Sequence, residues 1–454
     1  METIIQEFLE EMLKLNIEEG LSEFLTKGSN YLQSFFLEFT RYRIEELDEL
    51  VFSNKNIRQG YFVQRKGDAR TFETKHGTLT FHRRYYVSKD KEYVYLTDKL
   101  LGIDSYDRVE KGLCANLCKT ATETSYAKSS KLSCEGRVSK QTVMRLLRDV
   151  EEKPIEIQET RNHIKEIHIQ CDEDHVAMQD KSSSIVKMAT IHEEIQKQGN
   201  SKRRYLPEKH TVSSQSYETN EEYWYRILDT INKKYGIRED DNPLAVYIHG
   251  DGASWIKAGV GYVTNSHFVL DKYHFKQKLV KVSGNEESYI KLMWDAVRTN
   301  KIGKVRDMVD IFMNSEICTQ EVADDFFRYY LNNYEGIKIW KKLGPNKSSS
   351  CAEGLVSHIL SERLSSRPKG WSNEGLDAVS RLRVHCLNGG DITAQDFTSS
   401  IEDLKSPLLN LKEIRQNTEA SYDFAPFVTD ACRRTKRDGL YRLLTNIAEG
   451  GYKF

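Results

Sequence analysis

The first 55 residues alternate apolar and charged positions with the period of a helix. Ile5, Phe8, Leu9 and Met12 follow the i, i+3, i+4, i+7 spacing of one helical face, and glutamate fills much of the remainder. The pattern predicts helix over residues 1–55. Amphipathic stripes of this kind usually pack against other elements or against a second copy of the chain.

Between residues 70 and 100 the period changes to that of β-strands. Runs rich in threonine, valine and aromatic residues are split at Lys75-His76-Gly77, which predicts a small antiparallel unit. One strand carries the basic and aromatic run from His82 to Tyr86. Such a run either contacts nucleic acid or forms a charged, solvated sheet edge that blocks aggregation.

Residues 106–150 are predicted to form short helices. Ser139 is a suitable N-cap for a helix from Lys140 to Val150, and a second helix is expected near Thr122–Leu132. The pair has a helix-turn-helix pattern, which suits the DNA major groove but also occurs in ordinary helical hairpins. The side chains expected to face DNA are Lys140, Gln141, Arg145 and Arg148.

The segment 164–275 has an α/β pattern, and the chain that follows is helical. Strands are predicted at Ile164–Cys171, Ile185–Ile191, Leu244–His249 and Phe268–Leu270, with a helix at Glu221–Lys234. Three apolar stripes between residues 285 and 345 predict an all-α insertion into this unit. Residues 351–385 and 400–454 are also predicted to be mainly helical.

Composition excludes several classes of protein. At 454 residues the chain is long enough for several domains, and no apolar run approaches the ~18 residues of a membrane span. Eight cysteines are too few for a disulfide-stapled scaffold. Cys114, Cys118 and Cys134 lack a second close pair, so we expect buried thiols there rather than a zinc site.

The net charge of −1 conceals local asymmetry. Residues 1–24 hold seven Glu against one Lys, whereas residues 119–148 hold seven Lys or Arg against two Glu. Four further lysines and no acid occur between Lys272 and Asn285. Local basic patches can therefore attract a polyanion although the whole chain is almost neutral.

Acidic side chains stand where predicted elements end. Asp172 follows the first strand, Asp251 follows the third, and Asp271 follows the fourth, with His274 three residues later. Glu353 begins a helix after the insertion. Because functional groups of α/β sheets collect at the carboxyl ends of strands, these carboxylates are candidates for a two-ion Mg²⁺ or Mn²⁺ site.

Each of these acids also has an ordinary structural interpretation. Asp172 heads an acidic Asp-Glu-Asp-His run that resembles a solvated turn, and Asp251 suits a Gly-rich turn. Ser350-x-x-Glu353 has the form of a capping box, in which the glutamate bonds the N-cap amide. His274 could be a core histidine.

Five segments together resemble bacterial insertion-sequence transposases of the ISLre group, and the resemblance spans most of the chain. The segments are Cys171–Val176, His249–Ile256, Leu270–His274, Cys351–His358 and Leu360–Ser372. The resemblance implies a DDE transposase that cleaves DNA strands at insertion-sequence ends and transfers them. It also implies a ribonuclease-H-like core interrupted by a helical insertion.

The resemblance assigns roles to particular residues. Asp172, Asp251 and Glu353 would be the catalytic metal ligands, and Asp271 and His274 match the Asp-x-x-His signature of Mutator-like relatives. Asp174 competes with Asp172, because it lies two residues away on the same strand face. Further DNA contacts are expected from Lys276, Lys278, Lys281, Arg363, Arg367 and Lys369. Trp294 and Trp340 either stack on an extruded base or belong to a core.

The expected organisation is α/β with large helical parts. Its segments are a helical region (1–60), a β-rich unit (61–105), a helix-turn-helix-like region (106–160), the core in two parts (161–278 and 349–390), the insertion (279–348) and a C-terminal helical region (391–454). The expected partners are double-stranded DNA, comprising terminal inverted repeats and target, and further copies of the chain. We expect a cytoplasmic, nucleoid-associated protein without membrane contact. The alternatives are a ribonuclease-H-like nuclease without strand transfer, an inactive DNA-binding transposase relative, and an unrelated Mg²⁺ phosphohydrolase.

Overall fold

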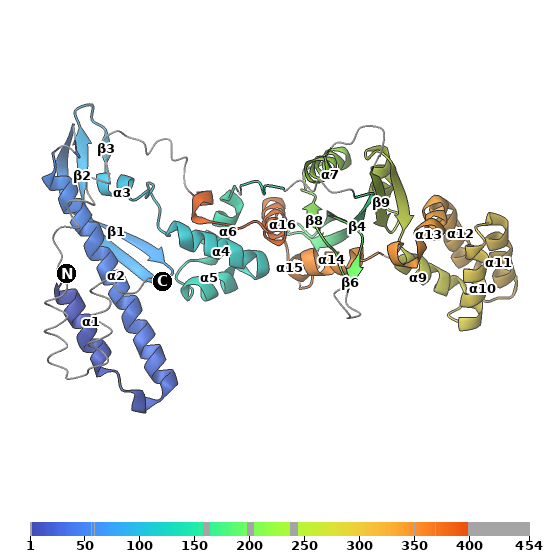
Figure 1. Ribbon diagram of the computed structural model, residues 1–454, viewed down its shortest axis with the longest axis horizontal. Helices are drawn as coiled ribbons and strands as arrows, with labels where there is room; N and C mark the ends of the chain where they lie inside the picture. Colours follow the sequence, from blue (N-terminus) through green and yellow to red (C-terminus); the bar gives the residue numbers. More distant parts are fainter. Residues whose placement is uncertain are drawn as a thin grey trace. The chain divides into compact units, whose positions relative to one another are not determined.

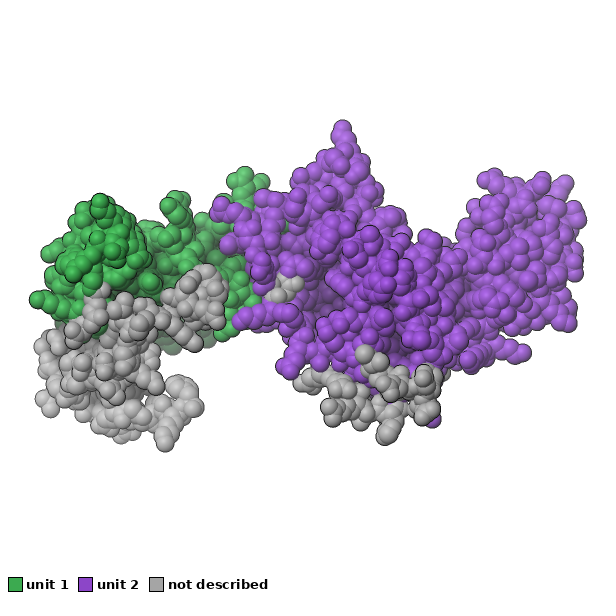
Figure 2. Space-filling view, turned by 90° about the horizontal axis from the view of Figure 1, so that it is seen from above, with its two compact units in different colours: residues 1–117, 126–143, 393–454 green, residues 118–125, 144–392 purple. Residues whose placement is uncertain are grey.

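The protein is a mixed α/β chain with two compact units, coloured separately in Figure 2. A computed structural model describes residues 2–55, 57–58, 60–151, 153–157, 164–197, 204–236, 244–348, 350–367 and 369–397. Unit 1 comprises residues 1–117, 126–143 and 393–454, and unit 2 comprises residues 118–125 and 144–392. The helical region predicted over 400–454 lies outside the described residues.

Unit 1 begins with two helices, as predicted, and continues with an antiparallel sheet. Helices α1 (Glu2–Lys14) and α2 (Leu21–Ser53) are joined through the short η1 (Ile17–Glu19). Strands β1 (Tyr61–Thr74), β2 (Gly77–Ser88) and β3 (Tyr93–Val94) form a sheet in that order, followed by α3 (Leu96–Leu100). The hairpin turns at Lys75-His76, where the sequence predicted it, but β1 begins earlier than expected.

The basic run on β2 is not a uniformly solvated edge. Arg83 is 3 % exposed, pairs with Asp98 at 2.7 Å and lies over the ring of Tyr95. Arg84 pairs with Asp48 of α2. These two arginines therefore hold α2 and α3 against the sheet.

Three helices follow the sheet along the chain: α4 (Lys111–Glu123), α5 (Tyr126–Cys134) and α6 (Lys140–Asp149). The hydroxyl of Ser139 accepts the Thr142 amide at 3.1 Å, so the predicted N-cap of α6 is present. The helix predicted near Thr122–Leu132 is instead broken after Glu123. Cys114, Cys118 and Cys134 are buried thiols, as expected.

Unit 2 contains a five-stranded sheet of order β10-β9-β4-β5-β8. Its strands are β4 (Glu166–Ala177), β5 (Ser183–His192), β8 (His210–Ser213), β9 (Ala245–Gly250) and β10 (Ser266–Leu270). Strands β4, β5 and β8 are antiparallel, whereas β9 and β10 run parallel to β4. The four predicted strands are present. Strand β8 and the ribbon of β6 (Gln196–Lys197) and β7 (Arg204–Tyr205) were not predicted.

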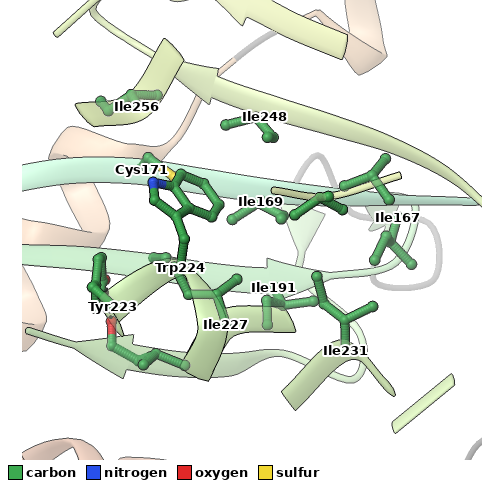
Figure 3. Packing of buried hydrophobic residues seen from close by; sticks show 14 of the residues in the cluster. Ile167, Ile169, Cys171, Ile191, Tyr223, Trp224, Ile227, Ile231, Ile248 and Ile256 are labelled. Atoms are coloured by element: carbon green, nitrogen blue, oxygen red, sulfur yellow. Dashed lines mark hydrogen bonds between the residues drawn. The ribbon is translucent and has the colours of Figure 1, made fainter. Parts of the chain in front are cut away.

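One face of this sheet is covered by α7 (Asn220–Tyr235), which a Thr219–Glu222 capping box starts. Figure 3 shows Trp224 of α7 beside Cys171 of β4, with Ile169 and Ile167 farther along the same strand in the same cluster. The Trp224 indole N–H donates to the carbonyl of Trp255 at 2.8 Å, so its polar atom is satisfied inside the core. This face is the main hydrophobic core of unit 2.

The opposite face receives α14 (Ala352–Val356), the π-helical turn η3 (Ser357–Ser361), α15 (Glu362–Leu364) and α16 (Asn373–Leu387). Figure 1 shows α14 and α15 on the side of the sheet away from α7. The turn after β9 leads into α8 (Ser254–Ala258) and η2 (Gly259–Gly261), and the short η4 (Ala394–Phe397) ends the described chain.

The predicted insertion is helical and has its own core. Helix α9 (Lys272–Val282) leads into α10 (Glu287–Arg298), α11 (Ile302–Asn314), α12 (Gln320–Asn332) and α13 (Tyr334–Lys347), which form one helical group (Figure 1). Trp294 and Trp340 lie against Phe275 in this core, and the Trp340 indole N–H donates to the Leu270 carbonyl at 2.8 Å. Both tryptophans therefore have core roles, which corrects the alternative of base stacking.

Candidate active site

The parallel pairing of β4 with β9 brings two carboxylates to the same level of the sheet. Gln170 pairs with His249, and Asp172 and Asp251 each follow two residues later. Since side chains alternate along a strand, Asp172 lies on the face opposite the hydrophobic core of α7. Asp172 does not close β4, as the sequence suggested, because the strand continues to Ala177.

The turn that carries Asp251 is fixed by several contacts. Its Oδ1 accepts the Ala253 amide at 2.9 Å, and the Tyr329 hydroxyl donates to its main-chain carbonyl at 2.7 Å. Gly252 has φ of +100°, and a Cβ there would lie 2.5 Å from the Asn333 Oδ1. A residue other than glycine would therefore displace the turn.

Asp271 and His274 form a pair beside this turn. The Asp271 amide donates to the Gly250 carbonyl at 2.7 Å, and Asp271 is the N-cap of α9. Its Oδ2 lies 2.8 Å from the His274 Nδ1. The hydrogen bond to Asp271, together with the charges of Asp251 and Asp172, raises the pKa of His274. The four side chains thus form one electrostatic cluster.

The carboxyl group of Asp172 is held where its negative charge is costly. Burial, followed by the nearby charge of Asp251, raises its pKa to about 6, although the Glu173 amide donates to its Oδ1 at 2.9 Å. A cation beside both carboxylates would offset this cost. The donor chemistry, carboxylate oxygens alone, fits a hard divalent ion such as Mg²⁺.

Glu353 lies in the first turn of α14, which packs on β4, and its side chain is exposed. The N-cap of α14 is Cys351, and the Ser350 hydroxyl accepts the Ala352 amide, so the capping box suggested by the sequence is not formed. Within the described ranges, no three His, Cys, Asp or Glu side chains are gathered closely enough to hold a metal ion. Asp172 and Asp251 are brought together, and Glu353 stands apart from them on the neighbouring helix.

Asp174, the alternative to Asp172, is engaged elsewhere. It is 7 % exposed, and its Oδ1 accepts the hydroxyls of Ser361 at 3.0 Å and Ser365 at 2.8 Å. Burial raises its pKa, and the two serine hydrogen bonds oppose that shift. Its hydrogen bonds therefore join β4 to the helical segment that carries Glu353.

The expected DNA contacts fall into two sets. The first set is exposed to solvent. It comprises Lys140, Gln141 and Arg145 of α6 and, in unit 2, Lys276, Lys281 and Arg367. Lys278 pairs with Asp325 at 2.7 Å, and with His274, Lys281 and Tyr329 it lines a cavity of about 310 Å³ beside Asp251.

Three other basic residues have structural partners. Arg363 is 3 % exposed and donates to the Ala121 carbonyl at 3.0 Å, so it cannot reach a phosphate, which corrects that expectation. Arg148 donates to the Ser372 hydroxyl at 2.6 Å, and Lys369 donates to the Arg363 carbonyl at 2.6 Å.

Sequence reasoning missed the polar residues that organise the site. Gln170 is fully buried within β4, and its Oε1 accepts the Ser350 hydroxyl and the Cys351 amide. Tyr329 comes from the insertion, far along the chain from Asp251. The available signal was the alternation of polar His168, Gln170 and Asp172 with apolar Ile167, Ile169 and Cys171 in the first part of the strand.

The described residues define a mixed α/β protein in which Asp172 of β4 and Asp251, which follows β9, lie at the same level of two adjacent parallel strands. Residues 14–400 match the profile described as "Uncharacterised protein family (UPF0236)", and the chain belongs to this family.

Several similar relatives come from Caldanaerobacter subterraneus subsp. tengcongensis, and each is named a UPF0236 protein. Two are 36 % identical over 355 residues, which cover 77 % of this chain and 74 % of the relative. A third is 36 % identical over 77 % of this chain and 70 % of its own length. The first name combines eleven loci of one genome, the second four and the third two. Such multiplication of one protein is typical of transposase-like families.

Within the described ranges, none of the helices combines the length and the apolar character that crossing a bilayer requires.

Proposed function

We propose that the chain is a DDE-type DNA transposase similar to those of the ISLre group, with Asp172, Asp251 and Glu353 as its catalytic carboxylates. The observation that carries the proposal is the register of β4 and β9, which sets Asp172 and Asp251 at one level of the sheet. Burial, with a smaller contribution from the charge of Asp251, raises the pKa of Asp172 to about 6. Paired acids of this kind are the ligands that a two-ion phosphodiester site requires.

The sheet order supports a ribonuclease-H-like core. Three antiparallel strands, β4, β5 and β8, are followed by two strands parallel to β4, and the Glu353 helix follows a helical insertion. The multiplication of relatives within one genome adds independent support, because mobile elements copy themselves to many loci.

In this proposal, Asp172, Asp251 and Glu353 hold two Mg²⁺ or Mn²⁺ ions. When bound, the ions lower the pKa of a water and stabilise the leaving oxygen of the phosphodiester. The hydrogen bonds of the turn, including the one from the Tyr329 hydroxyl, keep the Asp251 carboxylate at the end of β9. Asp271 orients His274, whose raised pKa favours the imidazolium, a charge suited to a phosphate oxygen.

The proposal assigns DNA contacts to exposed basic residues of unit 2 and, separately, to α6. Lys276 and Lys281 of α9 follow directly after the Asp271–His274 pair, and Lys281 lines the cavity beside Asp251. Phosphate contacts by these lysines make binding salt-dependent. Lys140, Gln141 and Arg145 of α6 are assigned to the terminal repeats.

Synapsis of two DNA ends requires at least two copies of the chain. Among the described residues of α2, Leu21, Leu25, Leu32 and Phe36 are exposed and recur at intervals of four and seven. Such a stripe is typical of helix pairing between copies. We place the protein in the cytoplasm at the nucleoid, where its DNA substrate lies.

The proposal is tested with a labelled duplex that carries the terminal repeat, incubated with Mg²⁺ or Mn²⁺. The wild-type chain is expected to nick the repeat end and join it to target DNA, and Glu353→Ala is expected to lose both products. Glu321→Ala is the matched control, because Glu321 is also an exposed glutamate in the first turn of a helix.

Other outcomes identify the alternatives. Nicked DNA without joined product would indicate a nuclease of the same fold. Salt-dependent binding without any product would indicate an inactive DNA-binding relative. Metal-dependent hydrolysis of small phosphate esters without DNA affinity would indicate an unrelated phosphohydrolase.

A further inference from the structure

One face of β4 carries a row of polar side chains, each engaged in a different contact. His168, Gln170, Asp172 and Asp174 occupy every second position of the strand and share the face away from α7, whereas Ile167, Ile169 and Cys171 belong to the core on the other face. Gln170 is fully buried and Asp174 is 7 % exposed. Asp172 stands between them, two residues from each.

Gln170 holds the start of the helix that carries Glu353. Its Oε1 accepts the Ser350 hydroxyl at 3.0 Å and the Cys351 amide at 3.2 Å. Its Nε2 lies 3.1 Å from the His192 Nε2, and the His192 Nδ1 faces the Glu193 carbonyl. A neutral His192 with its proton on Nδ1 satisfies both contacts, which fixes the orientation of the Gln170 amide.

Asp174 holds the other end of the same helical segment. Its Oδ1 accepts the hydroxyls of Ser361 and Ser365. Ser361 ends the π-helical turn, and Ser365 follows α15 and donates its amide to the Ser361 carbonyl at 3.0 Å. The two serines are four residues apart and therefore face the same side of the helix.

The contacts made by Gln170 and by Asp174 anchor the helical segment at two points. The distance between these points is similar along the strand and along the helix. Four residues of strand place Gln170 and Asp174 roughly 13 Å apart along β4. Ten residues of helix place Cys351 and Ser361 about 15 Å apart along the helical segment. The segment can therefore lie along the strand with both ends bonded, and Asp172 faces it between the anchors. Apolar packing alone would let the helix slide, whereas directed hydrogen bonds at both ends fix its register.

We propose that Gln170 and Asp174 are positioning residues that form a two-point clamp and set Glu353 in register with Asp172. The inference rests on the proposed function for its purpose, because it concerns how the third carboxylate is presented to the other two. Asp174 acts through the helix and is not a metal ligand. The clamp explains why two acids occur on one strand face only two residues apart.

The clamp is tested on the full chain by amide hydrogen exchange and by Mn²⁺ binding measured with electron paramagnetic resonance, neither of which needs turnover. Ser361→Ala combined with Ser365→Ala removes both donors to Asp174 and leaves the acids intact. We expect at least tenfold faster exchange over residues 353–365 and at least tenfold weaker Mn²⁺ binding. Ser357→Ala, an exposed serine of the same turn, is the matched control.

The Asp174→Asn variant distinguishes a positioning role of Asp174 from a role as a metal ligand. The amide oxygen still accepts both serine hydroxyls, so exchange protection and Mn²⁺ affinity are expected within about threefold of wild type. Loss of Mn²⁺ binding in Asp174→Asn, as large as that in Asp172→Asn, would overturn the proposal. Unchanged exchange in the double serine variant would overturn it as well.

These outcomes remain distinct from failure of the proposed function. If the wild type binds Mn²⁺ and the double serine variant does not, but neither acts on DNA, the clamp stands and the transposase proposal fails. If the wild type cuts DNA and the double serine variant retains wild-type exchange and Mn²⁺ affinity, the transposase proposal stands and the clamp fails.

Discussion

Several histidines of unit 2 are buried, and their burial makes the stability of this unit depend on pH. His168 and His249 contact each other at 2.8 Å through Nδ1 and Nε2, and His192 bonds Gln170. Burial lowers the pKa of His168 to about 3 and those of His192 and His210 to about 4, and it holds the pKa of His249 well below its usual value. In the folded chain these imidazoles are neutral at pH 7.

We expect acid to unfold this unit. Because the folded pKa values lie below the unfolded value near 6.5, the unfolded chain binds more protons and stability falls as pH drops from about 6.5 toward 4. The raised pKa values of the carboxyl groups of Asp172, Asp174 and Glu193 act in the opposite direction at acid pH, but the four histidines outnumber them. Urea midpoints measured from pH 8 to 4.5 should fall on acidification.

A variant tests whether the buried histidines cause the dependence of stability on pH. His249→Phe removes one buried imidazole, so the slope of stability against pH should become shallower whatever the absolute stability of the variant. Stability that rises between pH 6.5 and 4.5 in the wild type would contradict the argument.

Gly252 gives a second prediction at the scale of a residue. Its positive φ and the 2.5 Å approach of a Cβ to the Asn333 Oδ1 make Gly252→Ala strained, at a cost of about 1–3 kcal/mol. We also expect weaker Mn²⁺ binding, because the strained turn carries Asp251. Gly261→Ala is the control, since a Cβ there would meet no atom within 4 Å. Equal melting temperatures for the two variants would refute the prediction.

At the scale of elements, the sequence predicted those with strong apolar periodicity. Strand β5, helix α7 and the insertion helices follow from their buried stripes. The extension of β4 past Cys171 was missed, because Asp172-Glu173-Asp174-His175 has the composition of a solvated turn. Inside the strand, Asp174 accepts hydrogen bonds from two serines that are distant in sequence, and a local pattern cannot contain that information.

Short polar elements were missed for a related reason. Strand β8 is the four residues His210–Ser213, whose sheet pairing with β5 is decided by tertiary contacts. For Glu353, the local capping motif was present in the sequence, but the Ser350 hydroxyl bonds Gln170 instead. Local patterns therefore pointed to the candidate acids and not to the scaffold that arranges them.

Helix α6 carries a prediction about DNA recognition. Lys140 and Arg145 are exposed and suited to phosphates, whereas Gln141 is suited to a base edge. Arg145→Ala should weaken binding to all duplexes and reduce the salt slope by about 1, while Gln141→Ala should mainly lower the preference for the terminal repeat. Fluorescence anisotropy against salt concentration measures both effects.

The matched control for these variants is Lys304→Ala, which removes an exposed lysine of α11 in the insertion. This variant should bind DNA with an affinity within about twofold of that of the wild type. If Arg145→Ala and Gln141→Ala behave like this control, α6 is not the recognition helix and the helical hairpin has a purely structural role.

For the whole molecule, the candidate catalytic acids and the exposed basic residues lie on different elements. We therefore predict that substitutions can abolish DNA cleavage without abolishing DNA binding, and the reverse. Asp172 lies within β4, Asp251 follows β9 and Glu353 is in the first turn of α14. The exposed lysines lie on α9, and further exposed polar and basic residues lie on α6. With a net charge of −1, the chain has no general attraction for DNA, so in the proposed transposase local basic residues would supply the affinity.

Asp251→Asn tests this division. The substitution removes a negative charge close to the proposed phosphate path, so DNA affinity at low salt should stay equal or increase, while nicked and joined products disappear. Lys281→Ala should show the opposite pattern, with weaker binding and a smaller salt slope, because Lys281 lines the same cavity without being a carboxylate. Loss of DNA binding by Asp251→Asn at every salt concentration would mean that the acid turn supports the interface itself, and the separation of roles would be wrong.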